Sequence, residues 1–308
     1  MEGTPPVANM GPARRRSVVG LPAASWAYIV VAVAVGLLWI VARGAPGAIS
    51  AAEFYSPITI VTAFASVLVG AAFHARHPDA WSAHRPIAVA IGLSAVAGLL
   101  FPAGTILLWY GILAAAFRGR GLAVVEWGFA VDVVASILLI LSTALLWIGI
   151  RRARRQVDGP GVRAGRIGIW LLAGLVFLSS TPAFAVNLGH ATFDQRIYVL
   201  WGLATSAIQG LLSAGVTVAL VAGAMSGEHP RRAWWVAGVS RVFVLGGSLV
   251  YPALALVLRP LVSGVNVYII LVGMIGLIGA LGLLTGFALG LPADDSEIRA
   301  IPADEPPR

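Results

Sequence analysis

Residues 127–150 read WGFAVDVVASILLILSTALLWIGI, and the five residues that follow read RRARR. As a helix, the first stretch would be about 36 Å long, which exceeds the roughly 30 Å thickness of the hydrocarbon core of a bilayer. Asp132 is its single charged residue. A long apolar stretch that ends at several arginines is typical of a membrane-spanning helix that enters the cytoplasm there.

The composition of the whole chain supports the same class of protein. Of the 308 residues, 59% are hydrophobic and only 11% are charged, and the mean hydropathy is +0.90. Ordinary soluble domains are about half apolar and about one quarter charged. One core could not hide this much apolar surface from water. The composition therefore predicts an all-α, polytopic membrane helix bundle.

The residue types that are missing exclude several kinds of chemistry. All 21 basic residues are arginine, and the chain has no lysine and no cysteine. Without lysine there is no P-loop lysine, no kinase-type ATP lysine and no Schiff base to pyridoxal or retinal. Without cysteine there is no thiolate metal site and no c-type haem. We therefore expect no cofactor, and we expect the net charge of +8 to mark membrane sides rather than a nucleic-acid partner.

Apolar runs long enough to cross a bilayer recur along the chain, and we predict eight transmembrane helices. The first run resembles a secretory signal, but its length and the lack of a small-residue cleavage site favour a retained helix. The eight runs are residues 26–42, 54–73, 87–117, 127–150, 167–188, 197–225, 242–258 and 265–291.

The run at residues 87–117 decides the topology. It would be about 46 Å long as one helix, and Pro102 could split it into two spans. Two spans would place the six arginines of residues 151–166 on the side opposite the arginines of residues 14–16. One span, kinked near Pro102, keeps both groups in the cytoplasm together with the N- and C-termini, as the positive-inside rule requires.

This topology assigns sixteen arginines, Arg241 among them, to the cytoplasmic side. Residues 1–25 are then a flexible basic arm, residues 26–291 the transmembrane domain, and residues 292–308 an acidic disordered tail. The five arginines assigned to the outer side are Arg43, Arg118, Arg120, Arg196 and Arg259.

Two short motifs recur about 150 residues apart. The segment HPDAW at residues 77–81 resembles HPRRAW at residues 229–234, and FPA at residues 101–103 resembles YPA at residues 251–253. Both pairs fit a parallel 4+4 repeat with halves 26–150 and 167–291, a plan that occurs among transporters. The alternative is that such short motifs recur without duplication in a chain rich in glycine, proline and alanine.

Small residues spaced four apart predict close helix packing. Gly282, Gly286 and Gly290 form one stripe, and Ser206, Gly210 and Ala214 form another. Such stripes pack helices within one bundle or form the contact face of a homo-oligomer or a partner membrane protein.

Asp132 is the strongest candidate for a functional residue, because a carboxylate inside an apolar run must face water or a partner. It lies about 7 Å below the expected outer interface. We predict that it lines an outward-facing polar cleft together with Gln209, Asn187, His190 and Asn266. The alternative is an ion pair that only fixes helix orientation, with Arg118, Arg120, Arg196 or Arg259 as the partner.

The loop at residues 74–84 contains three histidines and one aspartate, which suggests a metal site. We predict no metal there, because Pro78 ends the helix and no second ligand cluster completes the set. Contact of a basic loop with anionic lipid explains the composition better. Intramembrane haem is disfavoured because no histidine lies deep in a span.

The sequence favours a permease-like protein that handles a small solute or ion within the lipid bilayer. A non-catalytic sensor or scaffold subunit is the alternative. An intramembrane enzyme acting on lipid is less favoured, because the chain contains no HExxH, GxSxG or Asp-rich diphosphate motif. The alanine, arginine and glycine bias is typical of a GC-rich bacterial genome, so we expect the protein in a bacterial cytoplasmic membrane.

Overall fold

The structure is a computed structural model that describes residues 21–44, 57–118, 122–154, 159–190, 193–228, 230–258 and 265–292. These residues form helices and short connections, and no strand occurs among them. Most of the expected arm and tail lies outside the described residues. The helices are α1 (Ala23–Gly44), α3 (Pro57–Arg76), α4 (Ala80–Ala83), α5 (Arg85–Arg118), α6 (Leu122–Ala153), α7 (Pro160–His190), α8 (Phe193–Met225), α9 (Arg231–Leu258) and α10 (Val265–Ala288).

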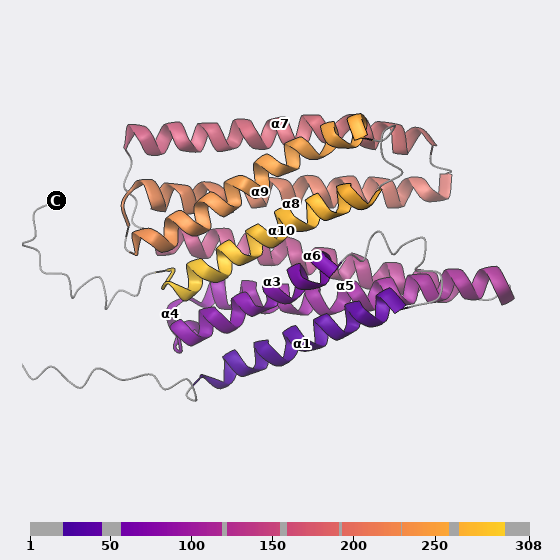
Figure 1. Ribbon diagram of the computed structural model, residues 1–308, viewed down its shortest axis with the longest axis horizontal. Coiled ribbons are helices and arrows are strands. Elements are labelled where there is room, and N and C mark those ends of the chain that lie inside the picture. Colours follow the sequence, from indigo (N-terminus) through magenta and orange to yellow (C-terminus); the bar gives the residue numbers. More distant parts are fainter. Residues whose placement is uncertain are drawn as a thin grey trace, which may run out of the picture.

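The long helices lie side by side and alternate in direction (Figure 1). The beginnings of α1, α5, α7 and α9 and the ends of α3, α6, α8 and α10 therefore share one end of the bundle. We call it the basic end, because it carries Arg76, Arg85, Arg151, Arg152 and Arg231.

In the described part of the chain, five helices are long and apolar enough to cross a membrane. Large apolar side chains are exposed on the outside of the bundle, for example Leu37 of α1 and Leu171 of α7. In water such exposure would be costly, whereas hydrocarbon accommodates it. The five segments are Ala23–Val41, Arg85–Leu108, Val124–Ala153, Pro160–Leu178 and Leu200–Met225. Two shorter apolar helices cover Ile60–Arg76 and Gly273–Ala288.

Helix α5 is one continuous helix with Pro102 in its interior. The sequence left open whether this run forms one span or two, and the single helix agrees with the one-helix prediction. Pro102 is fully buried. Neighbouring helices can satisfy the backbone groups that a proline frees in a membrane helix.

The helices pack in a pattern that repeats along the chain. Helix α1 packs on α3 and α5, α3 packs on α5, and α5 packs on α6. In the same order, α7 packs on α8 and α9, α8 packs on α9, and α9 packs on α10. Across the middle of the bundle, α3 packs on α10 and α8 packs on α6.

Glycines allow α5 and α6, the most extensively packed pair, to approach closely. A Cβ atom added at Gly128 would lie 2.7 Å from the backbone nitrogen of Leu108. A Cβ atom added at Gly111 would lie 2.7 Å from the backbone nitrogen of Val125. These contacts are with backbone, which cannot turn aside as a flexible side chain can. Glycine is therefore required for this helix spacing.

Gly128→Ala should destabilise the bundle, because its methyl group would push α6 away from α5. Overpacking of this kind costs about 1–3 kcal/mol. Gly174→Ala on α7 is the matched control, since nothing lies within 4 Å of a Cβ atom there, and alanine favours a helix over glycine by about 1 kcal/mol. Thermal unfolding of the purified protein in detergent measures both variants. Equal melting temperatures would contradict the close packing.

Candidate functional site

A polar cavity of about 200 Å³ lies in the middle of the bundle. Helices α3, α5, α6, α8, α9 and α10 line it, whereas α1 and α7 contribute no lining residue. Apolar lining comes from residues such as Val69, Ile91 and Leu283. The cavity has room for several water molecules or for a solute of a few heavy atoms. Its polar lining residues are Ser66, Ser94, Ser142, Thr143, Gln209 and Arg241.

Three polar lining residues lie at a similar distance from the basic end of the bundle. Ser66, Thr143 and Arg241 are each ten residues from the basic end of their helices α3, α6 and α9. At 1.5 Å per residue, all three are about 15 Å from that end. Gln209 is the central residue of α8. The cavity lining therefore extends from Phe287, next to the end of α10, to Gln209 at the centre of α8.

Arg241 is the cavity's only charged lining residue among those described. One terminal nitrogen of its guanidinium donates a hydrogen bond to Ser213 Oγ of α8. Its Nε atom is buried and has no partner among the described residues. Arginine keeps its charge in proteins, so a guanidinium inside an apolar helix bundle needs hydrogen-bond partners or water. Ser213 is the one hydrogen-bond partner of the Arg241 side chain among the described residues.

Gln209 offers a second polar group whose hydrogen bonding is incomplete. Its Nε2 atom donates to Thr143 Oγ1 at 2.7 Å, and Thr143 Oγ1 in turn donates to the carbonyl oxygen of Leu139. Gln209 Oε1 is buried without a partner among the described residues. The amide is thus held in place by its nitrogen, and its buried oxygen would have to turn toward the cavity to accept a hydrogen bond from water or a solute.

The chemistry of the cavity favours an anion. A guanidinium presents up to five N–H donors in a plane, which match the oxygens of a carboxylate or a phosphate. Serine and threonine hydroxyls can donate further hydrogen bonds. No carboxylate occurs among the described lining residues, so nothing in the lining competes with a bound anion for Arg241.

Asp132 lies outside the set of cavity-lining residues. Its carboxylate fits against Gly104 of α5, where any added Cβ atom would collide with Asp132 Oδ1. That oxygen is buried without a hydrogen-bond partner among the described residues. The structure therefore places Gln209 in the central cavity and Asp132 at the α5–α6 contact.

The other residues predicted for the cleft cannot be placed as side chains. The backbones of Asn187 and His190 belong to α7, and that of Asn266 belongs to α10, but their side chains lie outside the described part. Among the predicted ion-pair partners, Arg196 of α8 is exposed. The side chain of Arg118, and all of Arg120 and Arg259, lie outside the described residues. The outward-facing cleft and the ion pair stay predictions.

Sequence reasoning missed Arg241, Ser142 and Thr143. Arg241 was assigned to a cytoplasmic loop before a span at residues 242–258. The structure instead begins α9 at Arg231, which places Arg241 within the helix and in the cavity. One signal could have revealed this: Ala233, Ala237 and Ser240 continue a helical spacing of small residues before the apolar run begins.

The histidines of residues 74–84 pack against aromatic rings. The ring of His74 is buried and stacks on Tyr28, with centroids 5.4 Å apart. His77 lies 3.3 Å from the carbonyl oxygen of Leu291 through Nε2. No group of three or more histidine, aspartate or glutamate side chains placed to hold a metal ion occurs in the described part of the chain. The absence of a metal stays a prediction.

Asp132→Asn should leave the melting temperature unchanged or raise it. The amide has nearly the same shape as the carboxylate and removes a charge for which the described residues provide no partner. Thermal unfolding in detergent, with Gly128→Ala as the reference for a disrupted α5–α6 contact, measures the effect. A fall in melting temperature as large as that of Gly128→Ala would instead support the ion pair with one of the four candidate arginines.

No protein-family model, curated protein or solved structure shows a significant similarity to this chain.

Proposed function

We propose that this chain is a permease-like membrane protein that moves a small anionic solute through the central cavity. The observation that carries the proposal is the part-buried guanidinium of Arg241, which lines the central cavity with one hydroxyl partner among the described residues and has its Nε atom buried. Ionisable residues inside a membrane helix bundle are rare and usually mark a pathway for a substrate or an ion.

The size and the polar groups of the cavity limit the solute. A volume of about 200 Å³ suits a small carboxylate or an inorganic oxyanion. Arg241 would bind its negative oxygens, and Gln209 Oε1 would accept a hydrogen bond from a hydroxyl or amino group of the solute. Ile91 and Leu283 would contact its apolar part.

We further propose that the bundle has eight spans in two duplicated halves, with α1, α3, α5 and α6 equivalent to α7, α8, α9 and α10. Under this correspondence, every packed pair of long helices named above has a counterpart in the other half. The contact of α3 with α10 then corresponds to the contact of α8 with α6. His229, the first residue of the HPRRAW motif, lies outside the described residues.

Equivalent positions support this duplication in more detail. Ile91 and Arg241 are 150 residues apart, the same offset as the FPA and YPA motifs, and both line the cavity. On α6 and α10, Leu139, Thr143 and Leu146 line the cavity, as do the residues 137 positions later, Gly276, Ala280 and Leu283.

Two glycine contacts follow the same offsets. Gly149 of α6 approaches Ile87 of α5, and Gly286 of α10, 137 positions later, approaches Ala237 of α9, which is 150 positions after Ile87. Three helices of each proposed half line the cavity. In transporters with internal repeats, the substrate site lies between the repeats near the midplane.

Arg241→Gln should weaken specific anion binding. The purified protein would be tested by thermal shift with acetate, lactate and inorganic phosphate, and with glycerol and choline as neutral and cationic controls. We expect at least one anion, and neither control, to raise the melting temperature. Loss of a charged hydrogen-bond donor should weaken that binding about 10- to 100-fold, whereas Arg232→Gln, on the exposed start of α9, should not.

Transport is then measured as uptake of the radiolabelled anion into proteoliposomes. Saturable uptake by the wild type and by Arg232→Gln, but not by Arg241→Gln, is the expected result. Binding that depends on Arg241 without uptake would favour the sensor. Anion binding that is unchanged in Arg241→Gln, or no binding of any anion, would contradict the proposal.

The proposed topology places the basic end in the cytoplasm. Because the native chain has no cysteine, a single introduced cysteine reports its own side of the membrane. A membrane-impermeant maleimide applied to intact cells should label Arg196→Cys and should leave Gly159→Cys unlabelled until the cells are permeabilised. Gly159→Cys is suitable because nothing lies within 4 Å of its Cβ position. The reverse labelling pattern would show that the predicted orientation is wrong.

A further inference from the structure

A second polar cavity lies at the basic end of the bundle, away from the Arg241 cavity. It has a volume of about 270 Å³ and is lined by three arginines, Arg151, Arg154 and Arg166, together with two tryptophans, Trp147 and Trp170. Val218 and Ala219 complete the lining. None of these residues lines the central cavity.

The packing of three helices explains why this cavity exists. Helices α6 and α7 each pack against α8, but they make no extensive contact with each other in the described part of the chain. The cavity therefore lies between α6 and α7 and has α8 as its floor. Trp147 is held against that floor, because a Cβ atom added at Gly215 would lie 2.8 Å from two atoms of its ring.

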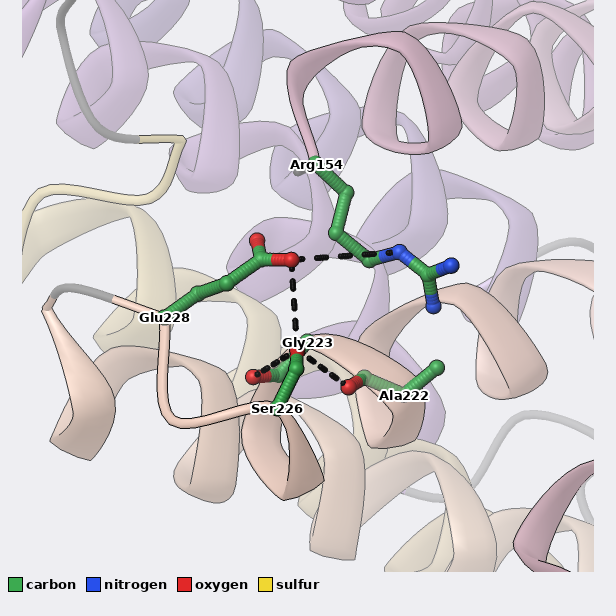
Figure 2. A network of polar contacts seen from close by, with 5 residues as sticks. All are labelled: Arg154, Ala222, Gly223, Ser226 and Glu228. Atoms are coloured by element: carbon green, nitrogen blue, oxygen red, sulfur yellow. Dashed lines mark hydrogen bonds and ion pairs between the residues drawn. The ribbon is translucent and has the colours of Figure 1, made fainter. Parts of the chain in front are cut away.

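One of the three arginines is buried and is oriented by a polar network (Figure 2). The side chain of Arg154 is only 8% exposed, and its Nε atom lies 3.9 Å from Glu228 Oε1. Glu228 Oε1 also accepts a hydrogen bond from Ser226 Oγ, at 3.2 Å. The hydroxyl of Ser226 is in turn 2.7 Å from the carbonyl oxygen of Ala222. This network holds the arginine on one side of the cavity.

The charge of the region is positive, even though Glu228 pairs with Arg154. Residues 151–166 contain six arginines and a single acidic residue, Asp158. Three of those arginines line one small cavity. Clustered guanidiniums favour the oxygens of a phosphate group, which they can bind through paired N–H donors.

The surface beside the cavity is apolar. Ile167, Leu171, Leu175 and Leu178 of α7 are all more than half exposed, and they extend along α7 away from the basic end. Trp170 is partly exposed next to them. Tryptophan at the boundary between a polar and an apolar zone is typical of the headgroup level of a membrane. The cavity thus lies where the phosphate of a lipid would be, and the apolar side of α7 lies where its acyl chains would extend.

We propose that this cavity binds the phosphate group of an anionic membrane phospholipid. Arg151, Arg154 and Arg166 bind the phosphate oxygens, Trp147 and Trp170 contact the headgroup region, and the acyl chains lie along α7. Inorganic phosphate shares the charge chemistry but lacks the chains, so the apolar surface beside the cavity favours the lipid. The site does not depend on transport through the central cavity.

The test compares two double variants in the same arginine-rich stretch. Arg151→Gln/Arg166→Gln removes two lining arginines, whereas Arg152→Gln/Arg163→Gln removes two exposed arginines that do not line the cavity. Both variants lose the same formal charge. Binding of dioleoylphosphatidylglycerol and of dioleoylphosphatidylcholine to the full-length protein in detergent is measured by native mass spectrometry.

We expect the wild type to prefer phosphatidylglycerol. Each arginine near an anionic headgroup contributes about fivefold to the affinity. The variant that lacks two lining arginines should therefore bind phosphatidylglycerol about 30-fold more weakly than the wild type, whereas the control variant should keep most of its affinity. Equal losses in the two variants, or no preference for the anionic lipid, would overturn the proposal. If inorganic phosphate at millimolar concentration displaces the lipid completely, the assignment of the site to a lipid is overturned.

Fluorescence quenching provides a readout that does not depend on overall charge. Trp170 and Trp235 are each 41% exposed, but only Trp170 lines this cavity. With phosphatidylglycerol brominated on its acyl chains, Trp170→Phe should reduce the quenched fraction of the fluorescence more than Trp235→Phe does. That difference should disappear in the Arg151→Gln/Arg166→Gln background. A difference that persists there would count against arginine-dependent binding at this site.

Discussion

The fold depends on one constraint: a backbone that crosses hydrocarbon must satisfy its own hydrogen bonds, so it crosses as helices. Because the backbone must be helical, the side chains determine how closely neighbouring helices can approach one another. Glycines bring α5 and α6 into backbone contact at Gly111 and Gly128, and Trp234 of α9 lies directly over Gly223 of α8. Close contacts of this kind hold the neighbouring helices together around the central cavity, where the polar side chains gather.

Because the surroundings are apolar, the position of each charged side chain inside the bundle indicates whether that side chain has a structural role or binds a solute. Arg241 lies beside a cavity large enough for water or a solute, whereas Asp132 is enclosed against Gly104 at a helix contact. A cavity lets a charge exchange partners during a transport cycle, and a tight helix contact does not. This difference in surroundings, rather than depth alone, makes Arg241 the better candidate for solute binding.

The sequence predicted the helical class from its apolar runs, and it predicted the single helix across Pro102 because two spans would have put the arginines of residues 14–16 and 151–166 on opposite sides of the membrane. It also selected Gln209, which lines the cavity. It missed Arg241 because hydropathy locates apolar windows but not helix ends, and α9 begins eleven residues before the apolar run predicted at residues 242–258. It grouped Asp132 with Gln209 because depth can be counted along a chain, whereas the direction in which a side chain points depends on packing. Gly104, the neighbour of Asp132, became visible only when α5 and α6 were placed together.

The proposed duplication explains why the central site has a single arginine. Positions 91 and 241 are equivalent under the 150-residue offset, and both line the cavity. A strict repeat would therefore have an arginine at both positions. Two guanidiniums in one small apolar-walled space would repel each other and would double the cost of burial. The first half instead has Ile91, which keeps the shape of the lining without adding a charge. Under the proposed duplication, divergence at this pair of positions, as at Leu139 and Gly276 and at Thr143 and Ala280, gives the two halves different chemistry: Arg241 of α9 is cationic, whereas its counterpart Ile91 of α5 is apolar.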